Sequence, residues 1–84
     1  MITEKDVDTY TNILGSTALS KVVARLNDKG FRNKWGNPWT RQSLLPYWKG
    51  ELENIDLENQ IVAYALEEKN KAEELEEAKK QLSA

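Results

Sequence analysis

Residues 16–50 read STALSKVVARLNDKGFRNKWGNPWTRQSLLPYWKG, and this stretch decides the fold. Its first third carries apolar side chains at the spacing of one helix face: Leu19, Val22, Val23 and Leu26. A helix is therefore predicted from Thr17 to about Lys29. Ser16 is predicted to cap its start, and Gly30 to end it in the left-handed conformation.

The next segment is predicted to be an irregular loop, because Gly36, Asn37 and Pro38 break any regular element. A tight turn is predicted at Gly36-Asn37. Three aromatic side chains in the loop are predicted to anchor it to the core: Phe31, Trp35 and Trp39.

A shorter helix follows, from Arg41 to about Lys49, with Thr40 as its N-cap. Its predicted inner face consists of Leu44, Leu45 and Trp48. Pro46 falls past the first turn, where it removes a backbone hydrogen bond, so this helix is predicted to be short or bent.

Two further helices flank this stretch. The first is predicted from Glu4 to Leu14, with Thr3 as N-cap and Gly15 as its stop. The last is predicted to be capped by Asn54 and to run to about Leu82, which makes it on the order of 40 Å long. Its apolar side chains approach a heptad stripe and predict an oligomerisation seam of Ile61, Ala65, Ala72, Leu75 and Leu82.

The predicted fold class is therefore all-α. Residues 1–50 form a three-helix, helix-turn-helix-like head with an elaborated loop before its third helix. Residues 51–84 form a long acidic helix for self-association, which predicts a homodimer or homotetramer.

Charge separates the two parts. Between Ser20 and Gly50 the only acidic residue is Asp28, against seven lysines and arginines, whereas ten carboxylates face four lysines from Glu51 onward. A basic surface beside an acidic segment predicts a polyanion partner for the head.

Composition argues against several other classes. The chain has no cysteine and no histidine, so it lacks a disulfide framework, a thiolate metal site and an imidazole base. No enzyme activity, metal, cofactor or small-molecule substrate is predicted. The beginning of the chain lacks the basic start and apolar run of a signal peptide, and no apolar stretch is long enough for a membrane helix. A cytoplasmic protein without a membrane partner is expected.

The helix after Thr40 is the predicted reader of double-stranded DNA. Its exposed start supplies the predicted base contacts: Arg41, Gln42 and Ser43. The residues predicted to contact the DNA backbone are Lys21, Arg25, Lys29, Arg32, Asn33, Lys34, Asn37, Thr40 and Lys49. The loop before Thr40 is longer than the usual helix-turn-helix connection, and it is predicted either to be a contact element itself or to be a solvated loop.

Part of this stretch resembles a known family. The segments Ala24-Arg-Leu-Asn-Asp-Lys-Gly30 and Gly36-Asn-Pro-Trp-Thr40, followed by Leu44 and by Tyr47-Trp-Lys-Gly50, resemble the "recombinase" DNA-binding segment of large serine recombinases. The resemblance covers about a third of the chain. It implies a helical DNA-binding module whose reader helix begins at Thr40, Arg41, Gln42 and Ser43. Only 39 residues precede Thr40, so no recombinase catalytic domain is expected before it.

The leading hypothesis is a sequence-specific DNA-binding regulator or recombination accessory factor of a phage or mobile element. The alternative is a protein-interaction adaptor, with a coiled-coil tail and no nucleic-acid binding. Single-stranded nucleic acid is a third partner left open, because Trp35, Trp39 and Tyr47 could stack on bases where they are exposed.

Overall fold

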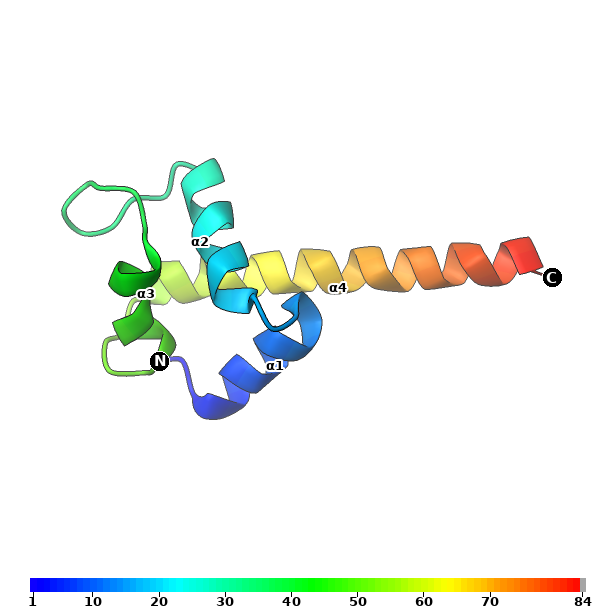
Figure 1. The fold of residues 1–84 in the computed structure, drawn as a ribbon, viewed down its shortest axis with the longest axis horizontal. Helices are drawn as coiled ribbons and strands as arrows, with labels where there is room; N and C mark the ends of the chain where they lie inside the picture. The colour runs from blue at the N-terminus through cyan, green and yellow to red at the C-terminus, as the bar shows by residue number, and fades with distance from the viewer. Residues whose placement is uncertain (84) are drawn as a thin grey trace.

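The computed structural model describes residues 1–83, and within them it contains four helices and no strand. The helices are α1 (Glu4–Leu14), α2 (Ala18–Asp28), α3 (Arg41–Trp48) and α4 (Ile55–Ser83). Figure 1 shows α1 and α2 against the first half of α4, with α3 packed against α2, while the second half of α4 projects away from them. The predicted all-α class is confirmed, and each predicted helix is present within about two residues of its expected ends.

Local capping bonds account for most of the helix starts. In α1, the Thr3 hydroxyl accepts from Asp6 N at 3.1 Å while the Asp6 carboxylate accepts from Thr3 N at 3.0 Å. Asn54 Oδ1 accepts from Leu57 N at 3.1 Å at the start of α4. The cap predicted at Ser16 is wrong, because Thr17 occupies the N-cap position of α2 and its side chain makes no capping bond.

The core draws on every helix. Its most deeply buried large side chains are Val22, Leu26, Leu44, Leu57 and Ile61. Leu57, Ile61 and Ala65 of α4 fill the space between the other helices, so the head includes the first three turns of α4. The boundary predicted between residues 1–50 and 51–84 therefore does not separate two cores.

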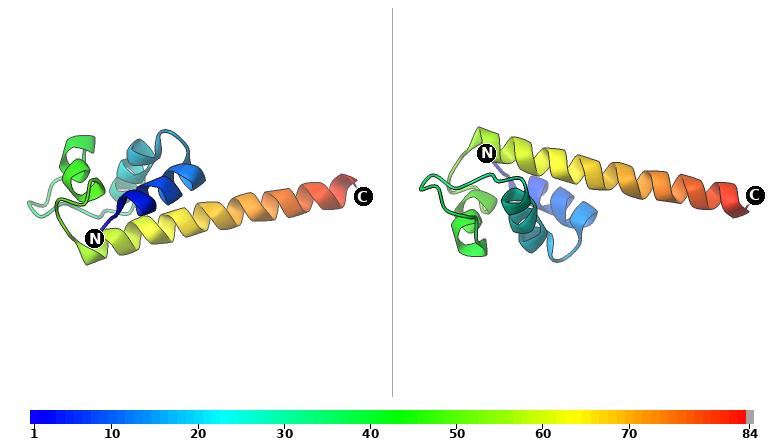
Figure 2. Two further views of the ribbon diagram at one scale, coloured as in Figure 1. Left: turned by 90° about the horizontal axis from the view of Figure 1, so that it is seen from below. Right: turned by 90° about the horizontal axis from the view of Figure 1, so that it is seen from above.

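Beyond Ala65, α4 loses contact with a core. Apart from Glu67 and Glu68, which are half-buried, residues 66–83 are exposed, and the molecule extends over 52 × 26 × 20 Å. Figure 2 shows from two sides that no other helix runs beside this C-terminal part, here called the tail (residues 68–83). Among the helices of residues 1–83, none combines the length and hydropathy that crossing a membrane requires.

Gly50 allows the N-terminal segment to close over the end of α3. Its φ of +78° lies in the left-handed region, and a Cβ atom there would lie only 2.6 Å from the carbonyl oxygen of Ile2. Ile2 itself is buried in the core. This position therefore requires glycine for its backbone conformation and for the close approach of another segment.

Replacing Gly50 by alanine is expected to lower the free energy of unfolding by about 2–4 kcal/mol, because strain and a backbone collision add together. Gly36 offers a matched control. Its φ of +79° is nearly identical, but nothing lies within 4 Å of a Cβ atom there. Gly36→Ala should cost only about 1 kcal/mol. Urea unfolding of both variants checks this, and equal costs would show that the contact with Ile2 is unimportant.

Candidate nucleic-acid interface

The Asn27 side chain fixes the position at which α3 begins. Its Oδ1 accepts from Trp39 N at 2.8 Å, and its Nδ2 donates to Trp39 O at 2.9 Å. One amide at the end of α2 thus satisfies both backbone groups of the residue two positions before α3. Asn27 is a structural residue that local sequence patterns did not single out, although it stands in the segment 24–30 that resembles the recombinase family.

Aromatic packing continues from this clamp. Trp39 is 3% exposed; its ring stacks on Phe31 with centroids 6.2 Å apart and meets Tyr47 edge-on at 5.6 Å. The predicted anchoring roles of Trp39 and Phe31 are therefore confirmed. Tyr47 is half-buried, so neither Trp39 nor Tyr47 offers an open face for stacking on a base.

The loop between these anchors ends in an ordered tip. Asn33 Oδ1 accepts from Trp35 N and from Asn37 N, both at 3.0 Å, and Gly36 N donates to Asn33 O at 2.9 Å. The turn therefore spans 33–36 and lies before the predicted Gly36-Asn37 position. The Asn33 side chain, predicted to contact DNA, instead holds this turn together.

Trp35 stands at that tip and is 71% exposed, so its predicted role as a core anchor is wrong. The Lys34 ammonium lies 4.4 Å from the centroid of the Trp35 ring. Both side chains are exposed on this turn, so neither is buried in the core. An exposed tryptophan on a basic, hydrogen-bonded loop is a feature of contact surfaces rather than of a folding core.

The three predicted base contacts at the start of α3 have different environments. Arg41 and Gln42 are exposed and line a shallow depression of ≈ 400 Å³ with Leu19 and Leu45. Ser43, by contrast, forms a capping box with Thr40: Ser43 N donates to Thr40 Oγ1 at 3.1 Å and Thr40 N donates to Ser43 Oγ at 2.8 Å. Ser43 and Thr40 therefore use their hydroxyls to start the helix.

Two predicted backbone contacts on α2 already have partners within the chain. Lys21 Nζ donates to Leu14 O at 2.6 Å, at the end of α1. Arg25 forms an ion pair with Glu67, and its guanidinium lies 5.1 Å from the centroid of the Tyr64 ring. Both bonds join α2 to neighbouring helices, which sequence spacing on one helix does not reveal.

The Glu67 carboxylate also pairs with Lys71 at 3.3 Å. The hydrogen bond from Lys71, followed by that from Arg25, holds the pKa of Glu67 below its usual 4.5. A lowered pKa in the folded state contributes stability above pH 4.5, and this contribution is lost as the pH falls through the lowered value.

Glu67→Gln is therefore expected to cause a modest decrease in Tm at neutral pH, and the difference from wild type should vanish in acid. Thermal unfolding between pH 3 and 7 measures it. Glu77→Gln, which removes an exposed carboxylate from the tail, is the control and should follow the wild-type profile. A difference that does not shrink as the pH falls would contradict the assignment of the effect to these ion pairs.

The remaining cations of the basic half are exposed, and within residues 1–83 none of them forms an ion pair: Lys29, Arg32, Lys34, Arg41 and Lys49. Figure 1 places the loop and α3 at the end of the molecule opposite the tip of the tail. The tail carboxylates are therefore remote from the cations of the loop and α3, whereas Lys29, at the end of α2, lines a depression together with Glu67. Asn37 is exposed on the same loop.

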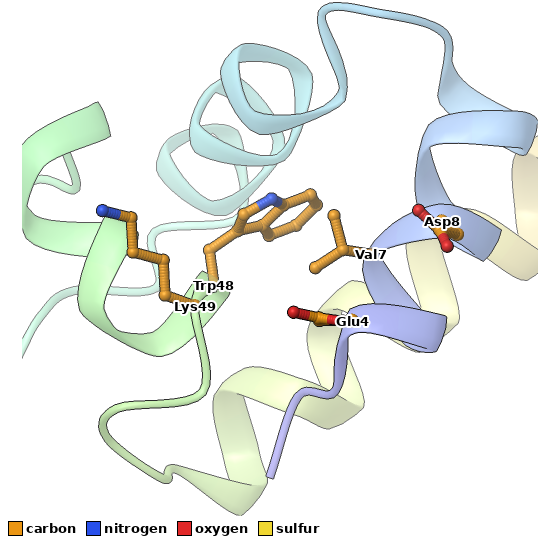
Figure 3. Close-up of a pocket in the computed structure, with 5 residues that line it drawn as sticks. All are labelled: Glu4, Val7, Asp8, Trp48 and Lys49. Carbon is orange, nitrogen blue, oxygen red and sulfur yellow. The ribbon is translucent and has the colours of Figure 1, made fainter.

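Lys49 has a different environment from the loop cations. It lines a pocket of ≈ 440 Å³ between α3 and α1, together with Trp48, Val7, Glu4 and Asp8. Figure 3 shows the Trp48 ring facing Val7, with Glu4 and Asp8 contributed by α1. The nearby carboxylates make Lys49 a weaker anion contact than the cations of the loop.

The residues of the predicted oligomerisation seam differ in burial. Ile61 and Ala65 are 0% and 4% exposed in the core of the single chain, so they are not available to a second chain. Ala72, Leu75 and Leu82 lie on the exposed tail. Of the predicted oligomerisation seam, only Ala72, Leu75 and Leu82 remain as candidates for contact with a second chain.

Comparisons with protein-family models, with curated proteins and with solved structures found no match. The resemblance to the recombinase segment accordingly remains a prediction from the quoted residues. The residues of that segment have structural roles in this chain. Leu26 and Trp39 are buried, Asn27 hydrogen-bonds the backbone of Trp39, and Gly30 ends α2 in the left-handed conformation at φ +71°.

Proposed function

We propose that the head is a double-stranded DNA-binding domain, an elaborated relative of the helix-turn-helix. The observation that carries the proposal is a group of exposed cations at one end of the molecule that form no ion pair with any described residue. The Glu67 carboxylate pairs with Arg25 on α2, whereas Arg32, Lys34 and Arg41 are exposed and form no ion pair within residues 1–83. Such a surface attracts a polyanion through release of its counterions.

In this proposal α3 reads the sequence. Arg41 can pair with the O6 and N7 atoms of guanine, and Gln42 with the N6 and N7 atoms of adenine. Both side chains are exposed at the start of the helix, and the Asn27 clamp fixes where that helix begins. Ser43 is left out of the reading surface, because its hydroxyl is engaged by Thr40.

The loop supplies the second contact element. Arg32 and Lys34 would meet phosphates beside the groove that α3 occupies, and Trp35 would lie against the sugar-phosphate edge or between bases. Self-association through the tail would join two such heads. A role as regulator or recombination accessory factor of a phage or mobile element rests on the family resemblance and is part of this proposal.

One observation favours a second candidate function. The exposed ring of Trp35, next to Lys34, also suits stacking on the bases of single-stranded nucleic acid. A single exposed ring gives one stacking position, whereas Arg41 and Gln42 give two groups matched to duplex base edges. The duplex is therefore the favoured partner.

The test is a titration of mixed-sequence duplex DNA, and of a single strand of equal length, at about 50 mM and 200 mM salt. Trp39 and Trp48 are 3% and 8% exposed, so changes in tryptophan fluorescence will report mainly on Trp35. Duplex binding that weakens steeply with salt would support the proposal. Preferential binding of the single strand would favour the second candidate, and no binding to either at low salt would refute both.

A further inference from the structure

We propose that the tail pairs with the tail of a second copy of this chain in antiparallel orientation, with Ala72 facing Leu75 of the second copy. The tail has a seam of Glu68, Ala72, Leu75, Lys79 and Leu82. These positions follow Ala65 in alternating steps of three and four residues, the repeat of a coiled coil. Leu75 and Leu82 are 57% and 87% exposed, so the described residues 1–83 leave two of its apolar side chains largely uncovered.

The position of the head excludes the parallel alternative. The seam continues the same side of α4 that Leu57, Ile61 and Ala65 bury in the head. In a parallel pair the two seams face each other at equal heights, so the two heads would compete for the same space. In an antiparallel pair the heads lie at opposite ends, as the extended shape in Figure 2 permits.

The charged residues of the seam also favour the antiparallel orientation. With Ala72 opposite Leu75 of the second copy, Glu68 falls opposite Lys79 of the second copy, and the two-fold symmetry repeats this pair. A parallel pair in register would instead place Glu68 against Glu68 and Lys79 against Lys79, which is unfavourable inside a seam. Each alanine also meets a leucine, so small and large side chains alternate across the contact.

The register follows from the same residues. Shifting the second copy by one heptad toward the head would set its Lys79 against Ile61, which is buried. Shifting it one heptad the other way would set Lys79 against Leu75 and leave Glu68 without an opposite cation. The register centred between Ala72 and Leu75 is the arrangement that pairs both charges and brings the second copy only to the edge of the head, where its Leu82 reaches the level of Ala65.

This register has a consequence that rests on the proposed DNA-binding function. The two Ile61 residues would lie about 25 residue positions, or about 37 Å, apart along the paired helices. Two half-sites separated by one turn of B-DNA lie about 34–36 Å apart. Because α3 and the loop lie at the outer end of each head (Figure 1), the two reading surfaces would be farther apart than this, and the tail would act as a spacer longer than one turn of a duplex.

Cross-linking tests the orientation without DNA. The chain has no cysteine, so Glu68→Cys and Lys79→Cys each introduce a single thiol. In the proposed register, a mixture of these two variants should form the mixed disulfide at least about tenfold faster than Glu68→Cys links to itself. The two Glu68 positions would lie about 16 Å apart, too far for a disulfide. A mixture of Glu73→Cys and Glu77→Cys, on the opposite side of α4, measures the background of random collisions.

Charge exchange gives an independent readout by sedimentation equilibrium. Glu68→Lys or Lys79→Glu alone should raise the dimer Kd about tenfold, because each disrupts two symmetric contacts. The double variant should return it to the wild-type value, whereas a parallel pair gains nothing from the exchange. The control, Glu73→Lys, should leave Kd unchanged.

Self-linking of Glu68→Cys at the rate of the mixture would overturn the antiparallel assignment. A monomer at all concentrations tested would overturn the pairing itself. Neither readout requires DNA, so failure of the duplex titration would refute the proposed function and leave the tail pairing intact. Conversely, duplex binding by a chain that sediments as a monomer at all concentrations tested would refute the pairing alone.

Discussion

Trp39→Ala is expected to lower the free energy of unfolding by about 3–5 kcal/mol, the largest stability effect of any single substitution proposed for this chain. The ring is 3% exposed and packs between Phe31 and Tyr47. Domains of 84 residues have a total stability of about 4–13 kcal/mol, so the variant would approach global unfolding. The corresponding fall in Tm is about 12–40 °C, measured by circular dichroism.

Two control variants show whether the loss of stability comes from the burial of Trp39 or from the loss of a tryptophan as such. Trp35→Ala removes the same side chain from an exposed position and should change stability by no more than about 0.5 kcal/mol. Trp39→Phe keeps an aromatic ring. The Trp39 Nε1 hydrogen has no hydrogen-bond partner within residues 1–83, so its removal breaks no bond there, and a cost of about 1–2 kcal/mol is expected. Equal losses for Trp39→Ala and Trp35→Ala would contradict this account of the core.

The second large effect concerns nucleic-acid affinity. The triple variant Arg32→Gln, Lys34→Gln and Arg41→Gln is expected to weaken duplex binding about 10²- to 10³-fold near 0.1 M salt. Each neutralised phosphate contact should also reduce the slope of log K against log salt by about one. Fluorescence or mobility-shift titrations at several salt concentrations measure both quantities.

A matched variant distinguishes a local site from overall charge. Lys5→Gln, Lys69→Gln and Lys80→Gln remove the same number of positive charges from exposed positions on α1 and the tail. This triple variant should retain affinity within about threefold, since these lysines lie outside the proposed interface. Similar losses for both triple variants would show that net charge, and not the loop and α3, governs binding. Neither variant alters a core residue, so both should remain folded.

The sequence predicted the helices well for local reasons. Periodicity, the Thr3 and Thr40 caps, and the stop at Gly15 act through residues within one or two turns of each other. Their effects can be recognised without knowing the fold. The exposed Arg41 and Gln42 at the start of α3 also followed from this local pattern.

The candidate site was only partly predictable, because several side chains are engaged by residues far away in sequence. Arg25 is neutralised by Glu67, 42 positions later, and Asn27 clamps Trp39, 12 positions later. A basic side chain on an isolated helix looks like a phosphate contact whether or not such a partner exists. Whether Arg25 is free to contact DNA can therefore be judged only once the packing of α2 against α4 is known.

By itself, the sequence determined four helices, a basic central part and an acidic tail, since these depend on composition and on neighbours along the chain. Tertiary structure decided that Trp35 faces solvent while Trp39 is buried, and that Ile61 and Ala65 belong to the head while Leu75 and Leu82 are uncovered. In each case the residues are chemically alike. Their burial differs because it depends on which distant segment packs against them.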